Sequence, residues 1–242
     1  MKKVNNSTYG HTGLPVIRSD ITIDGNNSTI RRDRSKPAFR IFAVAQNDEL
    51  TLRNTTVSGG RAADEGALGG GVYGYDSNIR IINSIISGNA GNAVSGLYSD
   101  IEVVNSAVAN NAGYGVIDAS PETGLGSVTV ANSTIARNSR AGLYGESSDI
   151  EGINTTISGN AIGVEGGDTE GLELVLVHST VTANRIGGVY VHCGKYGSKV
   201  VLQRCLISGS GGPEVRVDKC PSPYNTSVGT GDFNVFGDSG NA

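Results

Sequence analysis

Five residues near the C-terminal end could together carry proton-transfer chemistry. They are Glu165, Tyr190, His192, Arg216 and Asp218, and Tyr190 lies 25 residues after Glu165 and 26 before Arg216. Removing a proton from the carbon beside a uronate carboxylate, as a lyase or epimerase does, needs a base and a cation that stabilises the enolate-like charge. Tyr190 or His192 would be the base. Arg216 would bind the carboxylate bidentately, and Asp218 would orient His192. A solvated surface of mixed charge contains the same residue types, so both interpretations stay open.

A series of tyrosines could bind a sugar chain. Four of them end short segments that open with Gly, and these are Tyr73, Tyr98, Tyr144 and Tyr190. Alternation predicts that the four tyrosines point outward in one column. Ile117, Glu165 and Arg216 occupy the remaining levels of that column. The next outward column is expected to read Tyr75, Asp100, Ala119, Glu146, Gly167, His192 and Asp218. Aromatic rings stack on pyranose faces and carboxylates accept hydroxyl hydrogen bonds, so the four tyrosines with Asp100 and Glu146 are the predicted substrate-binding residues. Alternatively, the tyrosines are good strand residues whose rings stack on one another.

A repeated pattern must position these residues. Its seven clear copies begin at Leu50, Ile79, Ile101, Val128, Ile150, Leu174 and Val200. Each copy has alternating apolar residues, a bend residue that is usually Asn, then Ser or Thr, any residue, and Val or Ile. The bends are 22 to 29 residues apart, and a third short segment follows most copies. Three short strands with their turns need about 25 residues, which is one triangular coil of a parallel β-helix.

The sequence therefore predicts an all-β fold, a single right-handed parallel β-helix of about nine coils over residues 1–242. The alternating apolar residues should form inward columns, because a slip of one residue would turn every one of them toward water. The exposed ends of a solenoid would pair with other chains unless they were capped. Residues 1–20 are the expected N-terminal cap and residues 221–242 the C-terminal cap, with Phe233 and Phe236 covering the last coil.

The bend residues of the repeat and the three cysteines allow further predictions. Five copies carry Asn at the bend, a residue that tolerates the left-handed conformation and can bond to the next coil: Asn54, Asn83, Asn105, Asn132 and Asn154. His178 and Arg204 take this place in the last two copies, and Cys205 beside Arg204 is expected to be a buried thiol. Cys193 and Cys220 lie 27 residues apart, which leaves a disulfide between neighbouring coils or two free thiols open.

The composition excludes several classes of protein. Gly accounts for 36 of 242 residues and charged residues for 17%, which disfavours helical bundles and coiled coils. A net charge of −4 supplies no general basic field for nucleic acid, so no nucleic-acid partner is expected. No apolar run approaches a membrane span. Since no apolar segment follows Met1-Lys2-Lys3, either the protein is cytoplasmic or a leader lies outside this sequence.

Two further groups of charged residues carry open interpretations. The basic stretch Arg31-Arg32-Asp33-Arg34-Ser35-Lys36, with Arg40 close by, could grip an anionic polymer or a phosphate, or be a solvated loop. Asp232 and Asp238 in the tail could bind Ca²⁺ or simply form turns. No other metal or cofactor is expected, and the oligomeric state is not predicted.

The run from Gly13 to Arg31, the Phe39-Arg-Ile-Phe42 motif and the Asn-Ser-Thr-Ile blocks with Gly-Gly-Val-Tyr resemble bacterial β-helix repeat proteins of the pectate-lyase-like superfamily. The closest resemblance is to secreted or surface-anchored members, and it covers nearly the whole chain. It implies the fold, an extracellular or cell-surface location, and a substrate face on the Gly-opened strands. Function differs widely within such a fold. The motifs of polygalacturonases and alginate epimerases, and the clustered aspartates of Ca²⁺-dependent pectate lyases, are missing.

Three functions follow as hypotheses. The first is a non-catalytic extracellular domain that is adhesive or binds a polysaccharide or cell-surface glycan through the tyrosine face. The second is a small uronate lyase or epimerase that uses Tyr190, His192 and Arg216. The third is a structural spacer within a longer surface protein.

Overall fold

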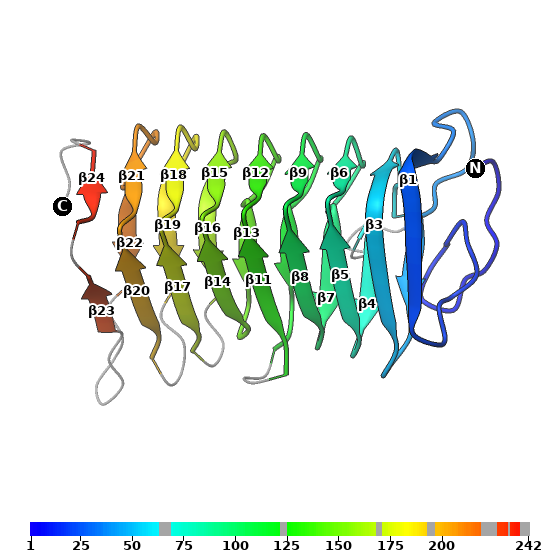
Figure 1. Ribbon diagram of the computed structural model, residues 1–242, viewed down its shortest axis with the longest axis horizontal. Coiled ribbons are helices and arrows are strands. Elements are labelled where there is room, and N and C mark those ends of the chain that lie inside the picture. Colours follow the sequence, from blue (N-terminus) through cyan, green and yellow to red (C-terminus); the bar gives the residue numbers. More distant parts are fainter. Residues whose placement is uncertain are drawn as a thin grey trace.

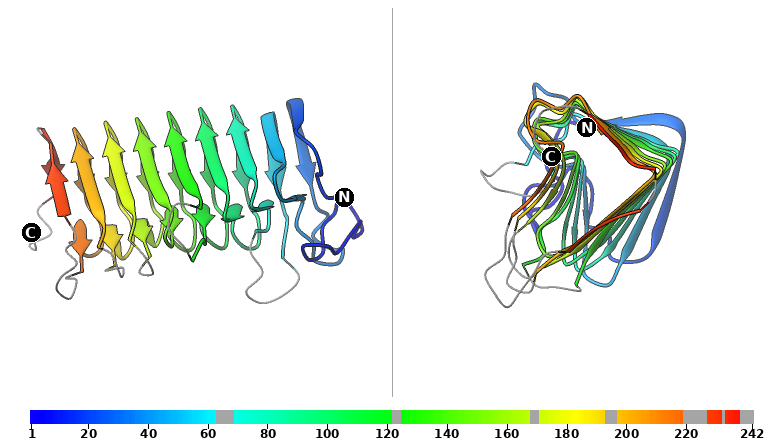
Figure 2. Two further views of the ribbon diagram at one scale, coloured as in Figure 1. Left: turned by 90° about the horizontal axis from the view of Figure 1, so that it is seen from below. Right: turned by 90° about the vertical axis from the view of Figure 1, so that its left-hand side faces the viewer.

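The chain forms one row of stacked coils (Figure 1). The computed structural model describes residues 1–62, 69–121, 125–167, 171–192, 197–218, 227–231 and 233–237, and these contain no α-helix. Strands of successive coils superpose in the end-on view and enclose a three-sided interior (Figure 2). The predicted parallel β-solenoid is therefore confirmed.

Each wall of the solenoid is a ladder of parallel strands. The first wall contains β5 (Asn78–Ile82), β8 (Asp100–Val104), β11 (Ser127–Ala131), β14 (Asp149–Ile153), β17 (Glu173–Val177) and β20 (Lys199–Gln203). The second contains β6 (Ile85–Ser87), β9 (Ala107–Ala109), β12 (Thr134–Ala136), β15 (Thr156–Ser158), β18 (Thr180–Thr182) and β21 (Leu206–Ser208). The third contains β2 (Phe42–Val44), β4 (Val72–Tyr75), β7 (Val94–Leu97), β10 (Val116–Asp118), β13 (Leu143–Gly145), β16 (Ile162–Gly166), β19 (Gly187–Val191) and β22 (Val215–Val217).

The ends of the row differ from its middle. The long strands β1 (Ile21–Arg31) and β3 (Glu49–Ser58) each run through the first and second walls, and β23 (Ser227–Thr230) and β24 (Val235–Phe236) form the last level. The eight strands of the third wall are separated by seven complete turns, so the expected count of about nine coils was slightly too high.

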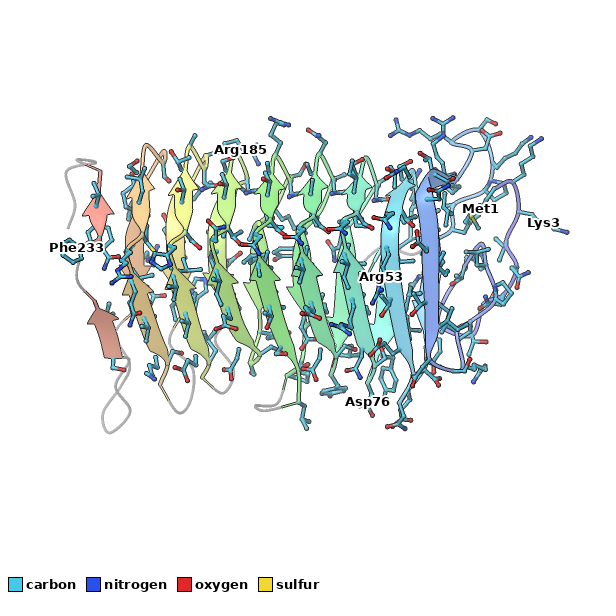
Figure 3. All side chains as sticks on the ribbon, viewed as in Figure 1. Met1, Lys3, Arg53, Asp76, Arg185 and Phe233 are labelled. Carbon is cyan, nitrogen blue, oxygen red and sulfur yellow. The ribbon has the colours of Figure 1, made fainter. Side chains whose placement is uncertain are left out.

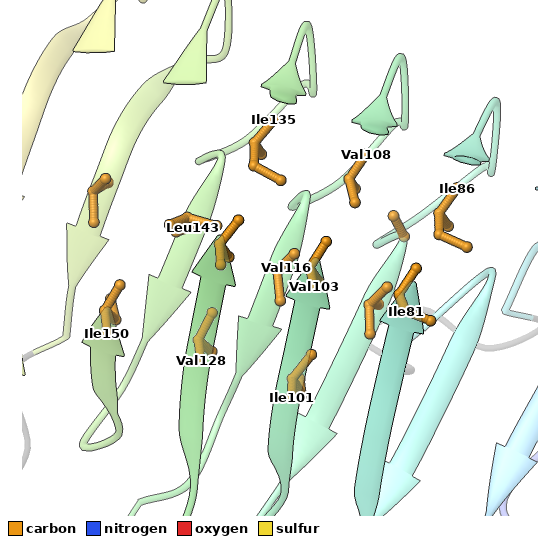
Figure 4. Packing of buried hydrophobic residues seen from close by; sticks show 14 of the residues in the cluster. Ile81, Ile86, Ile101, Val103, Val108, Val116, Val128, Ile135, Leu143 and Ile150 are labelled. Atoms are coloured by element: carbon orange, nitrogen blue, oxygen red, sulfur yellow. The ribbon is translucent and has the colours of Figure 1, made fainter. Parts of the chain in front are cut away.

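The core is a set of continuous apolar columns, as predicted (Figure 4). The first inward column is at most 1% exposed and contains Leu50, Ile79, Ile101, Val128, Ile150, Leu174 and Val200. Strand pairing places each of these residues directly above the next, for example Ile79 beside Ile101. Gly152 interrupts a neighbouring column, and Leu176 fills the space, since a Cβ atom on Gly152 would lie 2.7 Å from Leu176 Cδ2.

Two polar ladders hold the corners of the coils. At the bend between the first and second walls, the five predicted asparagines all have φ between 48° and 50°, and His178 and Arg204 adopt the same conformation with φ of 49° and 53°. The next residue in each coil has a small buried side chain. In one such pair, the Ser84 hydroxyl accepts a hydrogen bond from the Thr55 N–H at 3.1 Å. The predicted left-handed bend is thus confirmed, and it persists to the last copies.

The second ladder was missed by the sequence reasoning. Five asparagines at the corner between the second and third walls are at most 2% exposed and stack through the core: Asn89, Asn111, Asn138, Asn160 and Asn184. The Asn138 amide donates to Asn160 Oδ1 at 3.0 Å and to the Val108 carbonyl at 3.1 Å. Each rung therefore satisfies the backbone groups that this corner would otherwise bury without partners.

The two ends are covered unequally. At the N-terminal end, Ile17 is 7% exposed and pairs with Val44 of β2, while Met1 and Leu14 pack against the core. At the other end, Phe233 is 81% exposed and projects beyond the last coil (Figure 3). Phe236 extends the second wall beside Ile207 and is 44% exposed. The expectation that both rings cover the last coil is therefore wrong for Phe233, which faces solvent, whereas Phe236 lies beside buried Ile207 at the end of the second-wall core column.

Candidate functional site

The outer face of the third wall carries most of the residues predicted to do chemistry. Strand pairing gives its outward column as Ala43, Tyr73, Ser95, Ile117, Tyr144, Glu165, Tyr190 and Arg216. The predicted column is thus confirmed for Tyr73, Tyr144 and Tyr190. These side chains share a face because alternate residues of stacked strands point the same way.

Tyr98 does not belong to this column. Ser95 is the partner of Tyr73, whereas Tyr98 follows β7 in a turn with φ of 58°. The prediction failed because the Gly-opened rule does not hold in this coil. Ala93 occupies the place that Gly71 has one coil earlier, so Gly96 pairs with Gly74 and every residue after it shifts by three positions.

Asp100 was also misplaced by this shift. It begins β8 on the first wall, where it pairs with Asn78 and Ser127, and Leu97 takes the place beside Tyr75. Glu146 directly follows β13, as predicted, and its N–H donates to the Asp118 carbonyl. The outer face of the third wall therefore loses one of the two carboxylates assigned to sugar binding.

Two of the column tyrosines are covered by other parts of the chain. Tyr73 is 9% exposed and its ring lies 4.5 Å from the Arg40 guanidinium carbon. Tyr190 is 7% exposed, packs against Gly187, and donates its hydroxyl hydrogen to the Ile186 carbonyl at 3.0 Å. Neither ring can therefore offer a face to a sugar. Burial also raises the pKa of Tyr73, against the lowering influence of Arg40.

The half-buried tyrosines form two groups, which we call the aromatic strip: Tyr9, Tyr75, Tyr98, Tyr114 and Tyr144. In the first group the rings of Tyr9 and Tyr75 stack at 6.0 Å, and Tyr75 meets Tyr98 edge-on at 6.2 Å. In the second, Tyr114 and Tyr144 lie 4.9 Å apart. Sequence reasoning assigned no role to Tyr9 or Tyr114, because neither lies in a strand of the repeat.

The predicted ionisable residues do meet on the last levels of the third wall. His192 Nδ1 lies 3.1 Å from Asp218 Oδ2, and His192 Nε2 lies 3.4 Å from Glu165 Oε1. Arg216 Nε donates to Asp218 Oδ1 at 3.0 Å. We call Glu165, His192, Arg216 and Asp218 the ion cluster. Its geometry matches the predicted orientation of His192 by Asp218.

The contacts of the ion cluster affect the pKa of Asp218. Burial alone would raise the pKa of Asp218, but the hydrogen bonds from His192 and Arg216 outweigh it and hold that pKa below its usual range. Both ring nitrogens of His192 face carboxylates, Nδ1 that of Asp218 and Nε2 that of Glu165. The Tyr190 hydroxyl donates its hydrogen bond to the Ile186 carbonyl. A role for His192 as base would therefore require release of one carboxylate.

A buried carboxylate beside the aromatic strip was not anticipated. Asp118 is 0% exposed and accepts hydrogen bonds from the Ser120 and Ser148 hydroxyl groups. Ser120 in turn accepts the Tyr98 N–H at 2.8 Å, so Asp118 supports the turn that carries Tyr98. Burial raises the pKa of Asp118 to about 6, against the lowering influence of its hydroxyl partners.

Of the remaining predictions for cysteines and aspartates, the structure tests only that for Cys205. Cys205 is 2% exposed, which confirms the buried thiol, and burial raises its pKa. Cys193, Cys220, Asp232 and Asp238 lie outside the described residues, so the disulfide and the Ca²⁺ site stay predictions. Within the described residues, no group of three or more His, Cys, Asp or Glu side chains could hold a metal ion.

A family model described as "Right handed beta helix region" matches residues 41–204, most of the chain. The chain belongs to the right-handed β-helix family. In this β-helix protein the match begins at the third-wall strand β2 and ends in the bend after β20, so it includes the described aromatic strip from Tyr75 onward. Among curated proteins, no sequence matches the chain.

Solved structures similar to this β-helix protein include two enzymes. The crystal structure of pectate lyase Pel9A has a TM-score of 0.57 at 12% identity over 95% of this chain and 68% of that one. A mutant of the periplasmic alginate epimerase AlgG has a TM-score of 0.51 at 13% identity over 90% of this chain and 75% of that one. These identities establish a shared fold. No helix in the described part of the chain is long and apolar enough to cross a membrane.

Proposed function

We propose that this protein binds a polysaccharide, extracellularly or at the cell surface, along the outer face of its third wall. The aromatic strip carries the proposal, because its partly exposed rings Tyr75, Tyr98, Tyr114 and Tyr144 lie on four successive levels of the third wall, those of β4, β7, β10 and β13. Sugar rings stack on such aromatic faces, and repeated subsites suit a polymer better than a single sugar. The similarity to pectate lyase and to periplasmic alginate epimerase supports a polysaccharide partner and this location.

Polar groups beside the rings would supply hydrogen bonds to sugar hydroxyls. Arg140 lies over Tyr114 at 5.3 Å, and Glu146 follows the strand that carries Tyr144. A ring flanked by a cation and a carboxylate combines stacking with donors and acceptors, which is the mixture that sugar sites use. The buried rings of Tyr73 and Tyr190 are excluded from this surface and serve the fold.

Isothermal titration with a panel of uncharged polysaccharides tests the proposal. Replacing one ring of each group, in Tyr98→Ala with Tyr144→Ala, should weaken binding about tenfold or more, since each lost stacking contact costs roughly 1 kcal/mol. Tyr190→Phe is the matched control, because it alters a buried tyrosine on the same wall and should leave the affinity unchanged. Equal affinity of the double variant and the wild type would place the ligand elsewhere, and no binding to any polymer would leave the spacer hypothesis.

A second candidate function is a uronate lyase or epimerase at the ion cluster. The contact between His192 and Asp218 favours it, because a positioned imidazole beside Arg216 is the arrangement that proton transfer next to a carboxylate needs. Arg216 would bind the uronate carboxylate, and His192 would accept the proton once the substrate displaced Glu165. Elimination would then form a double bond between the deprotonated carbon and its neighbour as the bond to the glycosidic oxygen breaks, and that oxygen would take up a proton from water.

Incubation with polyuronates separates the two candidates. A lyase forms an unsaturated product whose ultraviolet absorbance grows with time, and an epimerase is detected by proton NMR. Activity should disappear in His192→Gln and Arg216→Gln but persist in the double tyrosine variant at high substrate concentration. Turnover unaffected by His192→Gln would remove the ion cluster from the reaction.

A further inference from the structure

A groove runs along the corner between the second and third walls. Two cavities of about 740 Å³ and about 540 Å³ share Arg32, Arg34, Gly59 and Gly88 and therefore form one continuous depression. Its lining comes from the segments that follow β1, β3, β6, β9 and β12. Five levels spaced about 4.8 Å apart give it a length of about 19 Å.

The groove is lined by cations. Its exposed basic side chains are Lys2, Arg31, Arg34, Arg61 and Arg137, and Asp33 is the one carboxylate among the described residues that line it. We call this the arginine groove. The groove is therefore locally positive in a chain whose net charge is −4.

The arginines are held in place without neutralising partners. Arg34 donates to the Gly88 carbonyl at 3.0 Å, and Arg137 donates to Asn110 Oδ1 at 3.1 Å. Within the described residues, neither one forms a salt bridge. Burial, with Arg61 and Arg34 nearby, lowers the pKa of Arg32 despite the opposing influence of Asp33. Guanidinium groups fixed through neutral acceptors keep their charge available to a ligand.

The groove continues toward the middle of the solenoid. Ser139 lines its far end, and the Ser139 carbonyl accepts a hydrogen bond from exposed Arg185 two coils further on, at 3.0 Å. Arg185 lies at the edge of the molecule in Figure 3. A row of cations longer than any compact ligand fits a polymer that carries a negative charge on each repeating unit.

We propose that the arginine groove binds an acidic polysaccharide through its carboxylates. Planar guanidinium groups form paired hydrogen bonds with carboxylates, and an open groove several residues long accepts a chain from either end. This site is distinct from the aromatic strip, since it shares no residue with the strip and recognises charge rather than sugar faces. It extends the basic stretch found in the sequence by adding Arg61 and Arg137 from later coils.

Titration with polygalacturonate at several salt concentrations tests this site. Removing two charges in Arg34→Gln with Arg137→Gln should lower the affinity about tenfold or more, because both guanidinium groups lose their charge-assisted hydrogen bonds to the ligand's carboxylates. Arg53→Gln with Arg204→Gln is the matched control. It removes two exposed arginines at the opposite bend and should change the affinity less than about twofold.

Further arms separate this site from its alternatives. Binding to polygalacturonate should survive in the double tyrosine variant and weaken as salt is added. Equal losses in both arginine pairs, or no binding by the wild-type protein, would overturn the proposal. An equal affinity for polyphosphate of matched charge would overturn the assignment to carboxylates, and retained affinity in Arg137→Glu would remove the groove as the site.

Discussion

Asp118 should make the stability of the protein fall as pH rises from acid to neutral. Its carboxyl is fully buried, and its pKa is raised from 3.8 to about 6. The folded chain therefore keeps a proton that the unfolded chain has already released. The contribution of protonated Asp118 to the free energy of unfolding is fully present below pH 3.8 and is lost as pH rises through about 6. The pKa difference corresponds to about 3 kcal/mol.

Asp118→Asn isolates this effect because it removes one ionisation and keeps the side-chain shape. The free energy of unfolding of the variant, minus that of the wild type, should rise by about 3 kcal/mol between about pH 3 and pH 7. For a chain of this size, that change corresponds to a shift in melting temperature of roughly 6–12 °C. A hydrogen bond lost from the Ser99 N–H lowers the variant's stability at every pH and so leaves the slope unaffected.

Denaturant unfolding at a series of pH values measures the slope. Tyrosine fluorescence can report it, since the chain contains nine Tyr and no Trp. A companion variant, Ser148→Ala, removes a hydroxyl that lowers the Asp118 pKa, so the stability should fall over a wider pH range and by a larger total amount than in the wild type. Parallel curves for Asp118→Asn and the wild type would refute the reasoning, because they would mean that the buried carboxyl ionises as it does in water.

Three further outcomes follow from the packing. Asn138→Ala should lower the free energy of unfolding by about 3 kcal/mol, because it leaves several buried polar groups unpaired. Asn132→Ala, at an exposed bend, should lower it by only about 1 kcal/mol. Equal losses of the two variants in urea denaturation would contradict this distinction. Gly152→Ala should cost about 1–3 kcal/mol by forcing Leu176 to move, and calorimetry showing an unchanged melting temperature would argue against this contact. Tyr190→Phe should cost about 1 kcal/mol for the lost hydroxyl hydrogen bond, which thermal unfolding would reveal.

The first two walls could be predicted from the sequence because their register has a single solution. In six coils the first-wall strand is joined to the second-wall strand by a bend of two residues. Alternation along the strands then determines which side chains enter the core. The third wall lacks such a fixed connection. There the start of each strand was inferred from a Gly residue. Because Ala93 stands in that place in one coil, Tyr98 and Asp100 do not lie in the columns predicted for them.

The candidate site was predictable in part for a related reason. The ion cluster formed as expected because its four residues lie in or directly after three successive and correctly registered strands, β16, β19 and β22. The exposure of the tyrosines was not predictable, since it depends on segments outside the repeat. Tyr9 comes from the N-terminal segment, and Arg40 packs on Tyr73 from the loop before β2. Periodicity describes strands and gives no information about what covers them.

The two-residue bend also determines where the coil can change length. From β5 to β21 every first-wall strand joins its second-wall strand through two residues, as at Asn83–Ser84. The connection after the third wall has no such limit, since Leu97 to Asp100 spans two residues and Asp118 to Ser127 spans eight. Inserted segments can therefore be accommodated beside the third wall without disturbing the stacking, which makes that border the natural place to graft a new specificity onto an unchanged frame.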